Sequence, residues 1–399
     1  MRQQALPLPS GPSSPARLLP SGDLEVTSLA CAGIAGVPLA EALSRSFAML
    51  RVLSARENVA RLGRDQGYRL EDAVHVDVHG LAAGDEAYAA AWLRRRLPPA
   101  ASVACEAGEG PLSLTARLQA RAPEHARAYH VDEDGRVSVE SVELHVVEHC
   151  NLRCAQCCNV SPYLGARTLS VEEIRVTCER LREVVRPDVL KIMGGEPLLH
   201  PDVGGILRAV RASEVAPRIR LFTNGLLLRT LDDAAFAALD ELTVSSYASA
   251  PVKEELLAAT EERALRFDVV LNVKTVDSFS TVLAGVPRSA AETQATYDAC
   301  WLRHRCLVVR RGVFYKCTRA AYHADYHGQV ALEGRDADAE ATQRALGIPL
   351  DAPDFAPRLA AYLGSAEVLA SCTHCFGSSG PLAPHVQLRK RDVAAGRLS

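Results

Sequence analysis

Between residues 142 and 273 the sequence alternates short β-branched runs with segments of helical periodicity, and no other feature constrains the fold as strongly. The runs expected to be strands are 142–147, 188–193, 218–222, 242–246 and 267–273. Helices are expected at 170–185, 203–212, 231–239 and 253–264, the first opening with a Ser170–Glu173 capping box and presenting an apolar face that ends at Val185. Because strands that alternate with helices form parallel sheets, the sequence predicts an α/β fold.

Polar and glycine-rich loops follow four of the predicted strands. Cys150–Cys157 comes after the first, Gly194–Pro197 after the second and Thr223–Gly225 after the third, while Ser245 and Ser246 close the fourth. In parallel β/α folds the loops at the C-terminal ends of the strands meet at one face, where the chemistry collects. We therefore expect these loops to form one site.

Cysteine is unusually frequent, with twelve residues of which ten lie after residue 149. The N-terminal segment is rich in Pro and Ser without a continuous apolar core, so no secretory signal is recognisable. In a chain that is not exported, grouped cysteines indicate metal or redox chemistry. Cys150, Cys154 and Cys157 bring three thiolates within eight residues, whereas a four-iron cluster normally takes four protein ligands, so one iron would stay open. A structural zinc site or buried free thiols are the alternatives.

The CxxxCxxC loop and the Gly194–Pro197 run together resemble the radical S-adenosylmethionine (radical SAM) superfamily. The resemblance implies a partial (β/α) barrel of five to six parallel strands, a [4Fe–4S] cluster on Cys150, Cys154 and Cys157, and S-adenosylmethionine (SAM) on the open iron. It also implies that Gly194, Gly195 and Glu196 hold the amine of SAM. The remaining positions expected near SAM are Asn224, Ser246 and Asn272, with Gln156 standing where relatives usually have an aromatic residue against adenine.

The cysteines that follow the barrel form a further set: Cys300, Cys306, Cys317, Cys372 and Cys375. A β-hairpin is expected at 307–315, turning at Arg311 and Gly312. This pattern resembles the twitch or shortened SPASM extension of radical SAM enzymes, which implies one auxiliary [4Fe–4S] cluster. The Cys-x11-Gly-x4-Cys spacing favours Cys300 over Cys306 as its fourth ligand, and a zinc site is the alternative. Cys158 is expected to point away from the first cluster.

These observations divide the chain into four parts. Residues 1–22 are expected to be a flexible tail because their composition offers little apolar surface to bury. An N-terminal α+β domain of unknown role is expected at 23–139, with helices near 39–62 and 85–96 and a strand at 73–78; His75 and His79 on that strand are expected to be ordinary histidines. The partial barrel then spans 140–285, and a small cluster-binding module spans 286–399.

Charge and hydropathy exclude two kinds of partner. Lys and Arg number 45 against 48 Asp and Glu, so the net charge of −3 leaves no positive excess to neutralise a nucleic acid backbone. The longest apolar stretch, residues 28–40, falls short of the roughly 18 residues that a membrane-spanning helix needs. We therefore expect no nucleic acid partner, no membrane insertion and a cytoplasmic location.

The resemblance also implies an activity. Reductive cleavage of SAM would yield a 5′-deoxyadenosyl radical, which abstracts a hydrogen from the substrate, with flavodoxin or ferredoxin as the electron donor. The first hypothesis is oxidation (dehydrogenation) of a small molecule, with the auxiliary cluster accepting an electron. The alternatives are a peptide-modifying maturase that forms a crosslink and, in a different class, a non-catalytic iron–sulfur electron carrier.

Overall fold

The computed structural model describes residues 129–300, 302–378 and 380–398, together with six short strands within the first 117 residues. The chain divides into two compact units, Met1–Glu124 and His125–Ser399. The domain boundary expected near residue 139 lies within the second unit, inside strand β8 (Val137–Val147).

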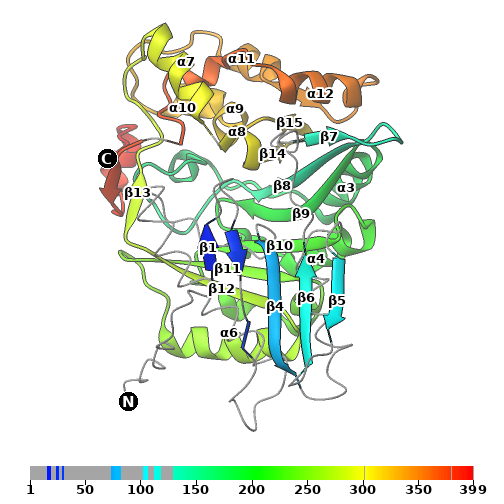
Figure 1. Cartoon of the computed structure of the whole chain (residues 1–399). Coiled ribbons are helices and arrows are strands. Elements are labelled where there is room, and N and C mark those ends of the chain that lie inside the picture. Colours follow the sequence, from blue (N-terminus) through cyan, green and yellow to red (C-terminus); the bar gives the residue numbers. More distant parts are fainter. Residues whose placement is uncertain are drawn as a thin grey trace. The chain divides into compact units, whose positions relative to one another are not determined.

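The first unit contains a mixed sheet with the strand order β1-β2-β4-β6-β5 and with β3 beside β4 (Figure 1). Its strands are β1 (Ala16–Leu18), β2 (Leu24–Val26), β3 (Leu29–Ala30), β4 (Ala73–Leu81), β5 (Ser102–Glu106) and β6 (Leu112–Arg117). The strand expected at 73–78 is confirmed, and it carries both His75 and His79. The helices expected near 39–62 and 85–96 lie outside the described residues.

The expectation that residues 1–22 form a flexible tail is wrong for one short part of that segment. Residues Ala16–Leu18 form β1, which pairs antiparallel with β2. The pairing satisfies backbone groups of both segments, and the composition of residues 1–22 alone does not reveal a partner that lies beyond them.

The second unit is built on a nine-stranded sheet with the order β12-β11-β10-β9-β8-β14-β15-β16, to which β7 (Tyr129–Val131) adds beside β8. Every neighbouring pair from β12 to β14 in this order is parallel. The expected α/β partial barrel is therefore confirmed, with six parallel strands. The strands in question are β8, β9 (Val185–Gly194), β10 (Arg218–Thr223), β11 (Glu241–Tyr247), β12 (Val270–Val276) and β14 (Leu307–Arg310).

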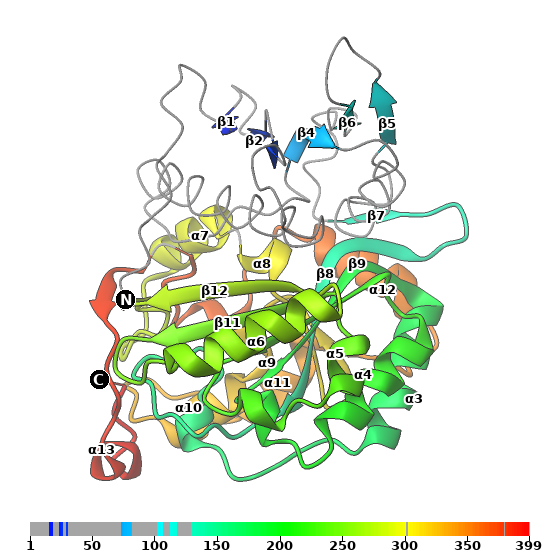
Figure 2. The ribbon, with the colours of Figure 1, turned by 90° about the horizontal axis from the view of Figure 1, so that it is seen from below.

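Helices cover one face of these strands. Figure 2 shows α3 (Val171–Val184), α4 (Val203–Ser213), α5 (Asp233–Ala237) and α6 (Glu254–Arg266) along the same side of the sheet. Between them and the sheet lies the main apolar core, which includes Leu190 and Ile192 of β9 and Ile219 and Leu221 of β10. Since side chains alternate along a strand, the residues between these positions face the barrel interior.

The first helix begins as expected and ends earlier. Ser170 accepts a hydrogen bond from the main-chain N–H of Glu173, and the Glu173 carboxylate accepts one from the Ser170 N–H in return, which completes the capping box. Val185 was expected on the apolar face of this helix, but it is the first residue of β9 and pairs with Val137. The pairing partner lies 48 positions earlier in the chain, so helical periodicity could not indicate it.

The hairpin expected at 307–315 is confirmed as β14 and β15 (Val313–Tyr315). Arg311 and Gly312 have φ angles of 51° and 72°, as a two-residue type I′ turn requires. β14 also pairs in parallel with β8, so the hairpin extends the barrel sheet at the edge opposite β12.

The rest of the second unit is mainly helical and lies beyond this hairpin (Figure 1). Its elements are α7 (Ala290–Ala299), α8 (Leu302–Arg305), α9 (Thr318–Ala321), α10 (His323–Gln329), α11 (Ala339–Ala345), β16 (Gly347–Pro349), α12 (Phe355–Gly364) and α13 (Lys390–Ala394). A two-stranded sheet joins β13 (Ser278–Ser280) to β17 (Leu382–Pro384). Among the described residues, no helix is both long and apolar enough to cross a membrane.

Candidate functional site

A cavity of about 290 Å³ lies where the loops after β8, β9 and β10 meet the end of β11. It brings together three sets of residues that the sequence separates by tens of positions. The lining includes Cys150, Cys154, Gln156, Cys157, Gly194, Gly195, Glu196, Asn224, Ser245, Tyr247 and Phe279. Of the residues expected to bind SAM or its cluster, only Ser246 and Asn272 are missing from this lining.

The first cysteine group, Cys150, Cys154 and Cys157, lines one side of the cavity. Hydrogen bonds reach two of its sulfurs: Asn224 Nδ2 lies 3.7 Å from Cys150 Sγ, and Gln387 Nε2 lies 3.4 Å from Cys154 Sγ. Burial raises the pKa of both thiols to about 12, so metal binding here would release protons. Three thiols beside open space fit a cluster that keeps one iron free for another ligand.

Cys158 also lines the cavity, and the expectation that its side chain points away from a cluster stays a prediction. Its Sγ donates a hydrogen bond to Asn159 Oδ1 at 3.4 Å. Asn159 Nδ2 in turn donates to the Gly194 carbonyl oxygen at 2.5 Å. The turn after Cys157 therefore packs against the end of β9, which keeps Cys158 at the cavity wall.

The two glycines after β9 allow this strand to pass close to the first cysteine loop. Gly194 has a φ of 144°, and a Cβ atom there would overlap the carbonyl oxygen of Val147. A Cβ at Gly195 would overlap the carbonyl oxygen of His149. The Gly195 N–H donates to Val147 O at 2.6 Å, and the Glu196 N–H donates to His149 O at 3.0 Å. Only glycine permits this approach, which holds the loops after β8 and β9 together.

Glu196 is 1% exposed, and its carboxylate is already engaged within the protein. It accepts hydrogen bonds from the main-chain N–H of Leu198 at 3.0 Å, from Thr223 Oγ1 at 2.6 Å and from the Asn224 N–H at 2.7 Å. Burial raises the pKa of Glu196, and these hydrogen bonds oppose the rise. The carboxylate therefore positions Asn224, whose amide contacts Cys150; a contact between Glu196 and the amine of SAM stays a prediction.

Strand parity decides which serine of β11 faces the cavity. Leu242 and Val244 pack in the apolar core against the helices, so Ser245 faces the cavity and Ser246 faces the helices. Ser246 Oγ accepts a hydrogen bond from the Val252 N–H at 3.1 Å. The alternation of apolar Leu242 and Val244 before Ser245 was the sequence signal that could have identified it.

Asn272 lies on β12 opposite Thr243, and its side-chain amide is 3.5 Å from Thr243 Oγ1. It faces the barrel interior, but its residue pair with Thr243 lies two positions before the pair that contains Ser245. Its position therefore provides a contact within the barrel wall, and proximity to SAM stays a prediction.

Gln156 adopts a left-handed conformation with φ 58°, and its Oε1 accepts a hydrogen bond from the Leu283 N–H at 3.3 Å. The aromatic surface of the cavity comes from elsewhere. Tyr247 at the end of β11 stacks on His385 with ring centroids 4.6 Å apart, and Phe279 of β13 meets Tyr247 edge-on at 5.6 Å. A flat base bound in the cavity would therefore meet aromatic side chains from β11 and β13.

The barrel interior beneath the cavity carries buried ion pairs. Lys191 Nζ lies 3.7 Å from the Glu143 carboxylate, and Arg220 makes a two-pronged contact with Glu241 at 2.8 Å. Burial raises the pKa of Glu143, but the hydrogen bond from His145 and the charge of Lys191 outweigh it and lower the pKa overall. These pairs neutralise one another, so they stiffen the barrel wall rather than offer free charge to a ligand.

The second cysteine group consists of Cys300, Cys317, Cys372 and Cys375, whose thiols interact electrostatically with one another. Gly377 links two of them, since its N–H donates to Cys375 Sγ at 3.2 Å and a Cβ on it would lie 3.3 Å from Cys300 Sγ. Burial raises the pKa of Cys375 to about 12. The structure thus brings together the set that the spacing favoured.

Cys306 lies apart from this group, because its thiol hydrogen-bonds the Glu143 carboxylate in the barrel interior. It follows α8 directly and precedes β14, whose pairing with β8 turns it toward that strand. Whether Cys300 or Cys306 completes the second cysteine group depends on tertiary position. Cysteine spacing indicates that position only indirectly.

The C-terminal segment 385–398 packs against the first cysteine loop. The sequence analysis did not predict this contact. The Ala155 N–H donates to Val386 O and the Gln156 N–H donates to Leu398 O, both at 3.0 Å. Gln387 accepts from the Arg153 N–H at 2.6 Å while its amide reaches Cys154. Nothing in the composition of this segment distinguishes it from an ordinary polar terminus.

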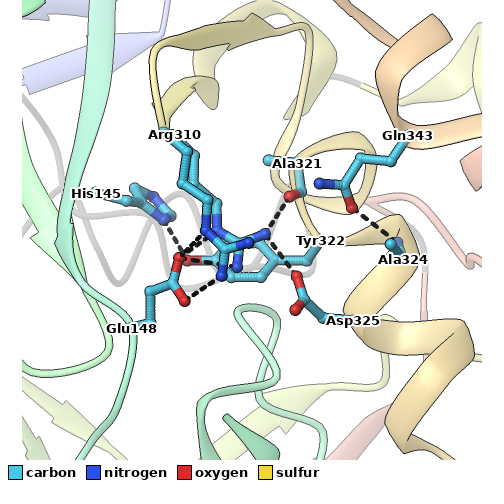
Figure 3. A network of polar contacts seen from close by, with 9 residues as sticks. His145, Glu148, Arg310, Ala321, Tyr322, Ala324, Asp325 and Gln343 are labelled. Atoms are coloured by element: carbon cyan, nitrogen blue, oxygen red, sulfur yellow. Dashed lines mark hydrogen bonds and ion pairs between the residues drawn. The ribbon is translucent and has the colours of Figure 1, made fainter. Parts of the chain in front are cut away.

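A network of charges joins the first cysteine loop to the hairpin (Figure 3). Glu148, two residues before Cys150, accepts hydrogen bonds from Arg310 Nε at 3.1 Å and Arg311 Nε at 2.7 Å. Arg310 also donates to Asp325 Oδ2 at 2.6 Å. Burial favours the neutral form of Glu148, but the hydrogen bond from Arg311 and the charge of Arg310 outweigh it and lower its pKa. The hairpin that precedes Cys317 is thereby fastened beside the first cysteine loop.

Comparison with protein families concerns the same part of the chain. Residues 144–273 match the family described as the Radical SAM superfamily. This segment is similar to radical SAM domains. The match begins within β8 and ends within β12, so it includes the loops that line the cavity.

Two curated relatives are similar to this chain over part of its length. GTP 3′,8-cyclase of Streptomyces coelicolor is 34% identical over 122 residues, which are 29% of this chain and 35% of that protein. Molybdenum cofactor biosynthesis protein 1 of Bos taurus is 32% identical over 157 residues, which are 38% of this chain and 24% of that protein. The chain spans about a third or less of the length of these relatives.

Two solved structures are also similar. BtrN in complex with AdoMet and 2-DOIA is 17% identical with a TM-score of 0.36, covering 60% of this chain and 94% of that chain. Native anSMEcpe with bound AdoMet and Cp18Cys peptide is 18% identical with a TM-score of 0.26, covering 35% of this chain and 43% of that chain.

Proposed function

We propose that this protein is a radical SAM enzyme that oxidises a small molecule by dehydrogenation. The observation that carries the proposal is the cavity in which the first cysteine group faces the glycine-rich end of β9 inside the segment similar to radical SAM domains. When bound there, a [4Fe–4S] cluster and SAM would supply one-electron reductive cleavage and a 5′-deoxyadenosyl radical. A flavodoxin or ferredoxin is the proposed electron donor.

The chain's own residues prepare this cavity in three ways. Cys150, Cys154 and Cys157 would bind the cluster and leave one iron open. Asn224, oriented by Glu196, would place its amide beside that part of the site. Tyr247 and Phe279 would shield the cavity from water with aromatic surface.

We propose that the second cysteine group binds an auxiliary [4Fe–4S] cluster rather than zinc. Four thiolates suit zinc as well as iron, so the case for a cluster is its redox chemistry. A cluster at this position would take up the second electron of the oxidation.

The relatives suggest a second reaction to be tested. GTP 3′,8-cyclase is similar over 29% of this chain, so GTP is a candidate substrate to be tested. A peptide substrate, with crosslink formation, is the other alternative within this class. We propose the small molecule first and keep the peptide as the alternative.

The decisive experiment is anaerobic reconstitution with iron and sulfide, followed by incubation with SAM and dithionite. We expect 5′-deoxyadenosine from the wild-type protein and none from Cys150→Ala, Cys154→Ala, Cys157→Ala combined. An electron carrier without its own substrate would give none from either protein. Addition of GTP in a parallel reaction tests the cyclase alternative, and we expect GTP to remain unconsumed.

A further inference from the structure

Arg319 is a buried cation with no hydrogen-bond partner in the part of the chain that the structure describes. It lies two residues after Cys317, in α9, and is 6% exposed. None of its three guanidinium nitrogens has a hydrogen-bond partner among the described residues. Its ring contact is Tyr326, whose centroid is 5.6 Å from the guanidinium carbon. A buried charge in this state is costly unless an anion accompanies it.

Two other buried cations of the same region have hydrogen-bond partners. Arg310, 1% exposed, binds Glu148 and Asp325. Lys316, also 1% exposed, donates from Nζ to Tyr297 Oη at 2.8 Å and to the carbonyl oxygens of Tyr362 and Ser365 at 2.8 and 2.9 Å. The fold therefore supplies hydrogen-bond partners to Arg310 and Lys316. Arg319 differs from them because the described residues supply it with none.

The groups within electrostatic reach of Arg319 identify the missing anion. They include the thiols of Cys317 and Cys375, from the second cysteine group, and the thiol of Cys158 at the cavity wall. Burial raises the pKa of each of these thiols, and the charge of Arg319 acts in the opposite direction. His323 is the neighbouring base, already bound to Asp336 at 2.7 Å. When Cys317 and Cys375 bind metal they become thiolates, and negative charge then faces the guanidinium.

We propose that Arg319 is a positioning residue whose charge stabilises the reduced form of an iron–sulfur cluster on the second cysteine group and so raises its reduction potential. This inference rests on the auxiliary cluster of the proposed function. Reduction adds one electron to the cluster, supplied by the substrate in turnover and by dithionite in the test, and increases its negative charge by one. Arg319 keeps its protons throughout. Net charge and nearby hydrogen bonds are among the properties that set the potentials of such clusters.

The test isolates the second site in the full chain. Cys150, Cys154 and Cys157 are replaced by Ala together, so that one cluster remains, and its potential is measured by dithionite titration followed by electron paramagnetic resonance. Arg319→Met and Arg319→Gln, which remove the charge, are compared with Arg319→Lys, which keeps it. Arg182→Met, a half-exposed arginine on α3 paired with Glu214, is the control for loss of a remote charge.

We expect both neutral variants to lower the reduction potential at unchanged iron content, with the Lys variant close to the parent and the Arg182 variant unchanged. If only one of the two neutral variants assembles its cluster, the reduction potential of that variant decides the question. A neutral variant with full iron and an unchanged reduction potential overturns the role of Arg319 but not the auxiliary cluster. If the protein with an intact Arg319 binds zinc or no metal at the second cysteine group, the auxiliary cluster is overturned. This inference is then overturned as well.

Discussion

The first cysteine group occupies eight consecutive residues after β8, whereas the second draws its thiols from positions 300 to 375. Hydrogen bonds from Gly195 and Glu196 to main-chain oxygens beside Cys150 hold the first group, so two adjacent strands position it. In the second group, Cys300 ends α7, Cys317 follows the hairpin, and the last two cysteines come after α12. The comparison teaches that the first site depends on local loops, and the second on how several helices pack.

The largest expected effect breaks the first site and leaves the second. Replacing Cys150, Cys154 and Cys157 with Ala should reduce iron from about eight to about four atoms per chain and abolish 5′-deoxyadenosine formation. Elemental analysis and chromatography measure the two quantities. Unchanged iron in the triple variant would contradict the assignment of these cysteines.

The next prediction tests which cysteine completes the second site. Cys300→Ala should lose the auxiliary cluster, about four irons, because Cys300 lies beside Cys375 across Gly377. Cys306→Ala is the matched control and should keep the iron, since its thiol contacts Glu143. Iron content and the resonance spectrum of each variant give the answer, and the reverse pattern would assign Cys306 instead.

Glu196 sharpens the comparison because its carboxylate joins two loops of the first site. Glu196→Ala should weaken SAM binding about 10- to 150-fold, the equivalent of losing a charge-assisted hydrogen bond of ~1.5–3 kcal/mol. The iron content should remain intact. Equilibrium binding of SAM to the reconstituted variant tests this, and an unchanged affinity would exclude both a direct contact and a role through Asn224.

The smallest expected effect concerns the approach of β9 to the first loop. Gly195→Ala should destabilise the protein by about 1–3 kcal/mol, because the added methyl group overlaps the carbonyl oxygen of His149. Gly285→Ala is the control, since a Cβ there meets no atom within 4 Å. Urea unfolding of the two variants compares them, and equal midpoints would show that the loops can separate without cost.

Several features of the fold and site could be predicted from local sequence. The strand and helix periods placed β8 to β12 and α3 to α6 to within a few residues, and Arg311-Gly312 indicated the hairpin turn. The cysteine loop and the Gly194–Pro197 run were recognisable because each is contiguous and follows a strand. Side-chain alternation also contained the choice between Ser245 and Ser246, and the structure places Ser245 at the cavity.

The sequence by itself determined the parallel α/β architecture and indicated metal or redox chemistry for the first cysteine group, because periodicity and contiguous motifs act over a few residues. Only the tertiary structure decided that β14 joins β8, that Cys300 rather than Cys306 lies with Cys317, and that Gln387 reaches Cys154. It also decided that Arg319 is buried without a hydrogen-bond partner in the described part of the chain. These features depend on contacts between segments separated by tens to hundreds of residues, and such contacts are selected by the packing of the whole core rather than by any local pattern.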